Sequence, residues 1–192
     1  IKMKSWVLGK NKSFSEYLSP AREKGKKMLK VSDKLWTYTP EPHDRTIVIS
    51  GHLLKQSVAG SDLSYEDTMG NDSMAEDYTA EIVGDEKIGE FNCKILNLTA
   101  TRKDVPYHKQ KIWVDTKKWL PIKQEMLAKG GKTLKRMEIR EIMKVGNKRW
   151  YPKVMFFKDL LSTGGGTEYY VDKIDIKTKV PASRFNKSRL RR

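Results

Sequence analysis

Hydrophobic and polar residues alternate with a period of two along most of the chain, which is the pattern of half-buried β-strands. Trp36 and Tyr38 share one face of a predicted strand, and Leu120, Ile122 and Met126 share a face of another. Helical periodicity does not recur over comparable lengths. The sequence therefore predicts a mainly β protein with short helices.

About a dozen segments show this strand pattern. Most are joined by turns of two to five residues, which favours antiparallel neighbours. A long, twisted antiparallel sheet tends to curl, so we predict one curved sheet that forms an incomplete, half-open β-barrel covered by helical segments. The predicted strands are Lys2–Leu8, Ser13–Leu18, Gly25–Val31, Lys34–Thr39, Arg45–Ser50, Tyr78–Val83, Lys87–Ala100, Tyr107–Asp115, Trp119–Ala128, Lys132–Val145, Arg149–Leu160 and Thr167–Val180.

Two further features refine this organisation. The apolar positions of Lys87–Ala100 change phase at residues 95 and 96, which predicts a β-bulge. After Pro181 the chain ends in a basic tail, residues 182–192, with Phe185 as its expected anchor. The length favours a single domain over residues 1–192.

The alternation stops between Gly51 and Met74, and this segment is the expected cover over one face of the sheet. At its centre lies the sequence GSDLSYED, residues 60–67. Its glycine permits a sharp turn, and its serine and acidic side chains suit helix starts. We interpret its residues as structural anchors for the cover; a plain capped turn between two strands is the alternative. The anchoring residues are Gly60, Ser61, Asp62, Ser64, Tyr65, Glu66 and Asp67.

The chain is strongly basic, with 39 Lys and Arg residues against 24 Asp and Glu residues and a net charge of +15. This charge favours anionic partners: nucleic acid, an anionic membrane surface or acidic proteins. The basic residues are spread over nearly every segment, which is typical of solvated strand faces. Aromatic residues could stack on bases, but in amphipathic strands burial in a core is the more common outcome, and we therefore consider nucleic acid an unlikely partner. These aromatic residues are Trp36, Tyr38, Trp113, Trp119 and Trp150.

No catalytic constellation is present, so we predict that the protein is not an enzyme and needs no cofactor or metal. The sequence contains no nucleophile elbow, phosphate-binding glycine loop or HExxH motif, and its three histidines are not spaced as a local metal site. Asp62, Glu66 and Asp67 give an incomplete calcium ligand set. Cys93 is the only cysteine, which excludes an intrachain disulfide, and its strand position predicts a small buried hydrophobic residue.

A curved sheet with an apolar inner face suits a carrier of hydrophobic ligands. Methionines on the predicted strands fit this interpretation, because their flexible side chains adapt to ligands without one fixed shape, although they also fill ordinary cores. No apolar run approaches the ~18 residues of a membrane-spanning helix. The expected cavity residues are Trp36, Tyr38, Leu120, Ile122, Met126, Met137 and Met155.

Several short motifs, taken in order, resemble the outer-membrane lipoprotein-sorting proteins of the LolA-like superfamily. The GSDLSYED block and its spacing from the earlier motifs are the most specific of these. The first group is Ser19-Pro20, Lys24-Gly25, Leu35–Pro40, Ile49–Gly51, Gly60–Asp67 and Asp77-Tyr78. The later group is Ile112–Asp115, Leu120-Pro121 and Gly131-Lys132.

The resemblance implies an incomplete β-barrel in the bacterial periplasm whose cavity shelters the acyl chains of lipoproteins in transit. It implies an inner-membrane transporter and an outer-membrane receptor as partners. Related chains begin with a signal peptide, an amphipathic helix and a first strand, which we expect to precede Ile1. The alternative function is an envelope interaction module that serves a membrane transporter without carrying lipid itself.

Overall fold

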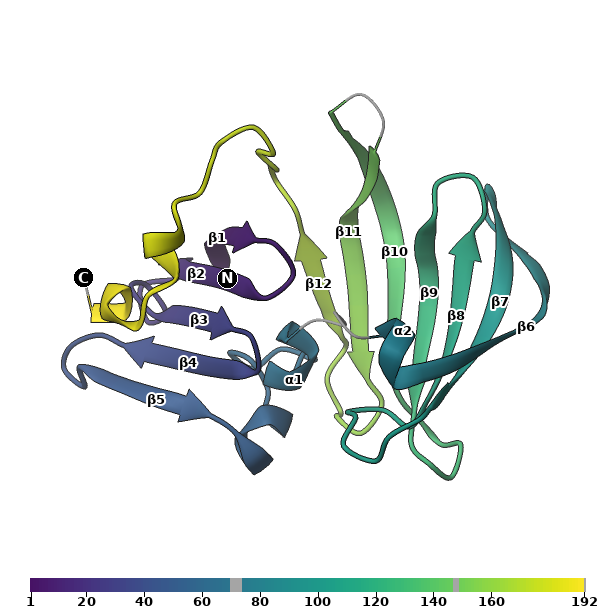
Figure 1. Ribbon diagram of the computed structural model, residues 1–192, viewed down its shortest axis with the longest axis horizontal. Coiled ribbons are helices and arrows are strands. Elements are labelled where there is room, and N and C mark those ends of the chain that lie inside the picture. The colour runs from purple at the N-terminus through teal and green to yellow at the C-terminus, as the bar shows by residue number, and fades with distance from the viewer. Residues whose placement is uncertain (70–73, 147–148, 192) are drawn as a thin grey trace. The chain divides into compact units, whose positions relative to one another are not determined.

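The computed structural model describes residues 1–69, 74–146 and 149–191. In this part of the chain, twelve strands form two antiparallel sheets (Figure 1), one of five strands and one of seven. The predictions of a mainly β fold and of about a dozen antiparallel strands are therefore confirmed. The prediction of one continuous curved sheet is wrong, because strand pairing stops after residue 49 and a second sheet begins at residue 78.

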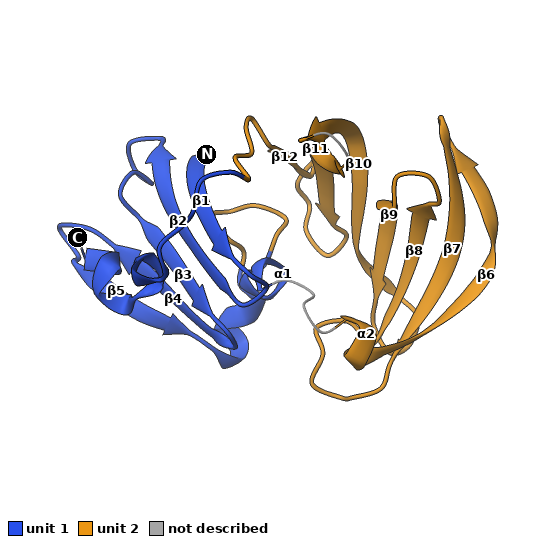
Figure 2. Cartoon of the chain, turned by 45° about the horizontal axis from the view of Figure 1, so that its top comes forward, with its two compact units in different colours: residues 1–56, 64–72, 177–192 blue, residues 57–63, 73–176 orange. Residues whose placement is uncertain are grey.

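The chain forms two compact units, each built from more than one segment (Figure 2). Unit 1 comprises residues 1–56, 64–72 and 177–192, and unit 2 comprises residues 57–63 and 73–176. The expectation of a single domain stays a prediction. The elements of unit 1 are β1 (Lys2–Leu8), β2 (Lys12–Ser19), β3 (Lys27–Val31), β4 (Lys34–Thr39), β5 (Arg45–Ile49), η1 (Gly51–Lys55), α1 (Tyr65–Thr68), η2 (Ala182–Phe185) and η3 (Lys187–Arg191).

The C-terminal segment completes the hydrophobic core of unit 1. The 3-10 helix η2 packs on β2 and β3, and η3 packs on β3 and β4. Phe185 and Leu190 are buried there against Phe14, Leu29 and Tyr38. Phe185 is thus the anchor of the basic tail, as predicted; residue 192 of this tail lies outside the described residues.

Unit 2 contains the seven-stranded sheet, with the strand order β12-β11-β10-β9-β8-β7-β6. Its core is a cluster of apolar residues from β7, β8, β9 and β10, with partly buried side chains of β11 packed against it. The elements of unit 2 are α2 (Met74–Asp77), β6 (Tyr78–Ile88), β7 (Phe91–Ala100), β8 (Lys109–Asp115), β9 (Leu120–Leu127), β10 (Thr133–Val145), β11 (Arg149–Asp159) and β12 (Thr167–Tyr170).

The boundary between β6 and β7 differs from the prediction. Gly84–Glu86 was expected to be a turn, but β6 continues through it and the turn lies at Gly89-Glu90, where Gly89 has a φ of 57°. The expected bulge of β7 lies instead on β6, since the register shifts between Ile82 and Gly84, opposite Leu96 and Ile95. The phase change in β7 arises because apolar side chains on both of its faces are buried or partly buried.

The last predicted strand, Thr167–Val180, is much shorter in the structure. The strand β12 ends at Tyr170, and Val171 adds one backbone hydrogen bond to Lys153. Alternation of polar and apolar residues continues beyond Tyr170, but Ile176 is 62% exposed. Alternation alone does not require a paired backbone, and an edge strand has only one neighbour to pair with.

The predicted cover segment contains short helices. The 3-10 helix η1 and the four-residue helix α1 lie within it, and α2 begins at its last residue, Met74. Residues 70–73 of this segment lie outside the described residues, and its role as a cover stays a prediction. Among the described residues, every helix is too short or too polar to cross a membrane.

We expect Leu190→Ala to destabilise the protein by about 2–5 kcal/mol, because the fully buried Leu190 side chain fills the core between η3 and the sheet. Urea unfolding measures this free energy. Leu161→Ala is the matched control, because Leu161 is 64% exposed, and its effect should stay within about 0.5 kcal/mol. Equal stabilities of the two variants would show that the C-terminal segment is not part of the core.

Candidate functional site

The first half of the GSDLSYED motif closes a tight loop in unit 2. The Val58 N–H donates to the Leu63 carbonyl oxygen at 2.8 Å, and the Ser61 hydroxyl donates to the Val58 carbonyl oxygen at 2.8 Å. Gly60 lies inside this loop with a φ of 76°, a conformation that favours glycine. The loop therefore fixes the backbone on both sides of Asp62, whose side chain is largely buried.

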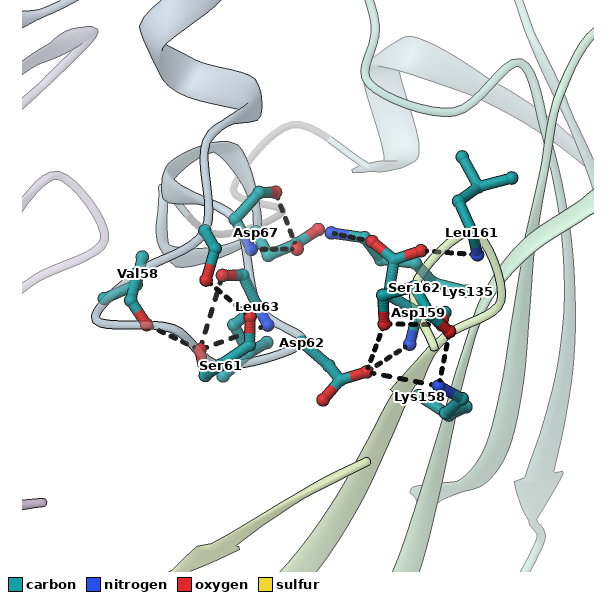
Figure 3. Close-up of polar contacts among 12 residues, drawn as sticks. Val58, Ser61, Asp62, Leu63, Asp67, Lys135, Lys158, Asp159, Leu161 and Ser162 are labelled. Carbon is teal, nitrogen blue, oxygen red and sulfur yellow. Dashed lines mark hydrogen bonds and ion pairs between the residues drawn. The ribbon is translucent and has the colours of Figure 1, made fainter. Parts of the chain in front are cut away.

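Asp62 joins this loop to the ends of β11 and β12. Its carboxylate accepts a hydrogen bond from the Asp159 N–H at 2.8 Å (Figure 3), and another from the Thr167 hydroxyl at 2.8 Å. The Asp62 N–H donates to Thr167 Oγ1 at 2.9 Å. Ser162 adds a longer hydroxyl contact at 3.4 Å, and Lys158 Nζ lies 3.9 Å away. Asp62 is thus hydrogen-bonded to the seven-stranded sheet of unit 2, while the anchoring of a cover by this motif stays a prediction.

This environment lowers the pKa of Asp62. Burial acts in the opposite direction and is the largest single influence, since only 9% of the side chain is exposed. The hydrogen bonds from Asp159, Thr167 and Ser162, together with the charge of Lys158, outweigh it and favour the carboxylate. Asp62 is therefore held in its ionised form as a structural anion.

The second half of the motif starts helix α1 in unit 1. The N–H and the hydroxyl of Ser64 both donate to Asp67 Oδ2 at 2.7 Å, which forms a capping box. The Tyr65 N–H donates to the Gln56 carbonyl oxygen at 3.1 Å. Burial and, to a lesser extent, the charge of Glu23 raise the pKa of Tyr65. Glu66 is partly buried in the same helical turn.

Two acidic residues of the motif, Asp62 and Asp67, therefore have different structural roles. Asp62 binds strand ends in unit 2, and Asp67 caps a helix in unit 1. Within residues 1–69, 74–146 and 149–191, no group of three or more His, Cys, Asp or Glu side chains could hold a metal ion. Cys93 is buried as predicted, and burial is the main factor that raises the pKa of its thiol.

Three methionines lie on one face of neighbouring strands in unit 2. Met137 of β10 is opposite Phe157 of β11, and Ile139 is opposite Met155. Met126 of β9 is on the same face, because Gln124, two residues earlier, is opposite Met137. We call Met126, Met137, Ile139, Met155 and Phe157 the methionine face. Met155 and Phe157 remain partly exposed.

A buried polar pair interrupts the apolar side chains of this sheet. Gln110 of β8 and Gln124 of β9 are 3% and 9% exposed, and the Gln124 amide donates to the Gln110 side-chain oxygen. A hydrogen bond with Gln110 also acts on the pKa of Tyr78, whose overall direction is upward because of burial. Alternation gave no signal for this pair, because glutamine is usually a surface residue.

The predicted cavity residues separate into two groups. Leu120, Ile122, Met126 and Met137 belong to the buried cluster of unit 2, and Met155 packs against it. Trp36 and Tyr38 belong to the cluster of unit 1, under Phe185 and Leu190. In addition, the Tyr38 hydroxyl donates to Asp44 Oδ1 at 3.0 Å. The structure thus brings five of the seven residues together.

The predicted burial of the aromatic residues is confirmed for Tyr38 and Trp113, is only partial for Trp36 and Trp150, and is wrong for Trp119. Trp113 is 3% exposed, and its indole N–H donates to Glu86 Oε2 at 2.6 Å. Trp119 is 78% exposed, because it lies in the turn before β9 with a φ of 56°, and not in the strand itself. A pocket of about 390 Å³ in unit 1 is lined by Thr46, Lys187, Ser188 and Arg191.

A family model described as "uncharacterized protein" matches residues 9–192. Among solved structures, an outer membrane lipoprotein-sorting protein domain from Vibrio parahaemolyticus is 26% identical, with a TM-score of 0.87 over 99% of this chain and 82% of that chain. No curated protein matches.

Two further structures share the fold at 23% identity. A DUF1329 family protein from Desulfovibrio piger has a TM-score of 0.77 over 93% of this chain and 76% of that chain. A LolA superfamily protein from Nitrosomonas europaea has a TM-score of 0.73 over 97% of this chain and 81% of that chain.

We expect Asp62→Ala to destabilise the protein by about 1–3 kcal/mol, because it leaves the partly buried donors at Asp159 and Thr167 without their acceptor. Chemical denaturation at neutral pH measures the loss. The control is Asp85→Ala, which removes an exposed carboxylate paired with Lys94 and should cost no more than about 1 kcal/mol. An Asp62→Ala variant as stable as the control would contradict the anchoring role.

The destabilisation of Asp62→Ala should also depend on pH. Because the pKa of Asp62 is lower in the folded protein than in the unfolded chain, its contribution is complete above the unfolded pKa of about 3.9. The contribution disappears as the pH falls through the folded pKa. We therefore expect the stability difference between wild type and variant to be constant from pH 7 to pH 5 and to shrink below about pH 4. A difference that grows on acidification would reverse the assignment.

Proposed function

Because this chain belongs to the family whose model spans residues 9–192, a LolA-like family with the outer-membrane lipoprotein-sorting fold, we propose that it is a non-enzymatic carrier. Its ligands are the acyl chains of lipoproteins or related hydrophobic molecules. Its compartment is the bacterial periplasm. This proposal joins the likeness to the Vibrio parahaemolyticus domain with the chemistry of the methionine face.

The methionine face is the observation that carries the proposal. Methionine side chains are unbranched and polarizable, so they adapt to flexible apolar ligands better than branched side chains do. Met155 and Phe157 are partly exposed on β11, while Met126 and Met137 are buried beside them. A sheet that offers a graded set of apolar contacts suits acyl chains of varying length.

An acyl chain exposed to water has a large unfavourable free energy. Each acyl methylene kept from water contributes about 0.8 kcal/mol, so a long acyl chain cannot cross an aqueous compartment without an apolar shelter. We assign this shelter to Leu120, Ile122, Met126, Met137 and Met155. Trp36 and Tyr38 are left out of the assignment, because the C-terminal helices already pack on their cluster.

Transfer of such cargo requires no covalent chemistry. Loading comes from an inner-membrane transporter, and release goes to an outer-membrane receptor that binds the acyl chains more tightly. The segment from Gly51 to Met74 is the movable cover in this scheme. A cover shifts the binding equilibrium only as far as its contacts differ between the loaded and empty states.

We expect Met155→Ala to weaken binding of a fluorescent fatty-acid analogue by roughly 5- to 30-fold, which corresponds to the loss of about 1–2 kcal/mol of apolar contact. Met155 is the chosen position because its side chain is only partly buried, so the variant should remain folded. Fluorescence titration measures the affinity, and the thermal midpoint reports the folding of each variant.

The matched control is Met3→Ala, a partly buried methionine of β1 in unit 1. Its affinity for the analogue should equal that of the wild type. Mass spectrometry of organic extracts from the purified protein gives an independent reading of bound lipid. If the wild type binds neither lipid nor the analogue, the carrier proposal fails, and an envelope interaction module without lipid cargo becomes the better description.

A further inference from the structure

Three turns lie at the same end of the seven-stranded sheet of unit 2 (Figure 1). They connect β6 to β7, β8 to β9 and β10 to β11, and the antiparallel order of these strands brings them to one end. The first two are also hydrogen-bonded through the Thr116 N–H and the Asn92 carbonyl oxygen at 3.2 Å. We call residues 86–92, 115–119, 144–146 and 149–150 the turn end.

The turn between β8 and β9 presents a tryptophan to solvent in a fixed orientation. Asp115, which is 1% exposed, accepts a hydrogen bond from the Lys118 N–H through its carboxylate at 2.7 Å. Its carbonyl oxygen accepts the Trp119 N–H at 2.9 Å. Trp119 itself is 78% exposed. A buried acidic side chain thus holds the turn while the indole ring points away from the core.

The backbone of Trp119 makes this exposure informative. Its φ of 56° lies in the left-handed region, which glycine or asparagine adopts far more readily than a bulky residue. The backbone at Trp119 is therefore strained. Because the ring is exposed, its packing contacts contribute little free energy to offset that strain. Strain of this kind, kept without a structural benefit, indicates that the side chain serves another purpose.

The charged residues around Trp119 indicate which kind of partner this surface binds. The described residues of the turn end include five cationic and three acidic side chains. One of the acidic side chains, Asp115, is buried. Lys118 Nζ lies 4.7 Å from the ring centre of Phe91 and 5.5 Å from that of Trp150. The five cations are Lys87, Lys117, Lys118, Lys144 and Arg149.

We propose that the turn end docks on the surface of an anionic phospholipid bilayer, with Trp119 inserted at the level of the headgroups. Tryptophan prefers this region because its ring is apolar and its N–H remains hydrated. Lysine and arginine side chains beside it meet anionic headgroups, each contributing roughly a fivefold gain in partitioning. This docking surface goes beyond the carrier function and does not use the methionine face.

The test is sedimentation of the purified protein with vesicles of equal parts phosphatidylglycerol and phosphatidylcholine. The wild type should bind these vesicles and not vesicles of phosphatidylcholine alone. Lys87→Gln with Lys117→Gln should weaken binding by roughly 30-fold. Trp119→Asn should remove the fluorescence quenching that brominated lipids cause in the wild type, while its thermal midpoint equals or exceeds that of the wild type.

The matched controls lie at the opposite end of the same sheet. Lys129→Gln with Lys132→Gln removes two exposed cations near the turn between β9 and β10, and Leu161→Ala removes an exposed apolar side chain. Both should leave vesicle binding unchanged. If the control lysine pair weakens binding as strongly as the pair at the turn end, the association follows net charge and the proposed surface is wrong.

Two other outcomes would also overturn the inference. One is equal binding of anionic and neutral vesicles by the wild type. The other is a thermal midpoint of Trp119→Asn well below that of the wild type, which would make Trp119 a packing residue. Binding of the fluorescent fatty-acid analogue by Trp119→Asn separates the two proposals. Retained analogue binding with lost vesicle binding in Trp119→Asn supports both, whereas a wild type that binds anionic vesicles but no analogue supports only the docking surface.

Discussion

The carboxylate of Asp62 is the constraint that joins the loop of residues 58–63 to the ends of β11 and β12. It accepts hydrogen bonds from residues 97 and 105 positions away along the chain, at the ends of β11 and β12. A largely buried carboxylate is tolerated only when such donors are in place, so the loop and the strand ends specify one another. Two residues further, Ser64 opens the capping box of α1. Eight consecutive residues therefore serve a sheet in one unit and a helix in the other.

Strand positions could be predicted well because alternation reports directly on side-chain burial. β1 and β4 have the predicted bounds, and the pairing of neighbours across short turns is as expected. The division into two sheets could not be predicted in the same way, because alternation carries no information about which backbone pairs with which. Between β5 and β6 the connection is long, so turn geometry does not determine which strand pairs with which. The expectation of one sheet is wrong at this point.

The candidate site was predictable only where local chemistry was sufficient. The pairing of Ser64 with Asp67 follows a local spacing and is present in the structure. The partners of Asp62 come from distant strand ends, and no spacing rule identifies them. Gln110 and Gln124 were missed because a buried amide pair is satisfied across two strands. Trp119 was assigned to a core because it was taken as the first residue of the predicted strand Trp119–Ala128, whereas β9 begins at Leu120 and Trp119 lies in the turn before it.

Apolar and cationic side chains lie on the same strands of the seven-stranded sheet, and Lys135 of β10 is directly opposite Met126 of β9. Side chains of its middle strands can be apolar and adaptable, because the alternation of the strands keeps them away from the solvated face. The turns are free of that requirement, and there lysine side chains cover aromatic rings, as Lys118 does over Phe91 and Trp150. Lysine stems lie along apolar surface while the ammonium groups stay hydrated. The net charge of +15 is thus compatible with the proposed apolar ligand surface, because a lysine side chain can cover apolar atoms and still keep its charge in water.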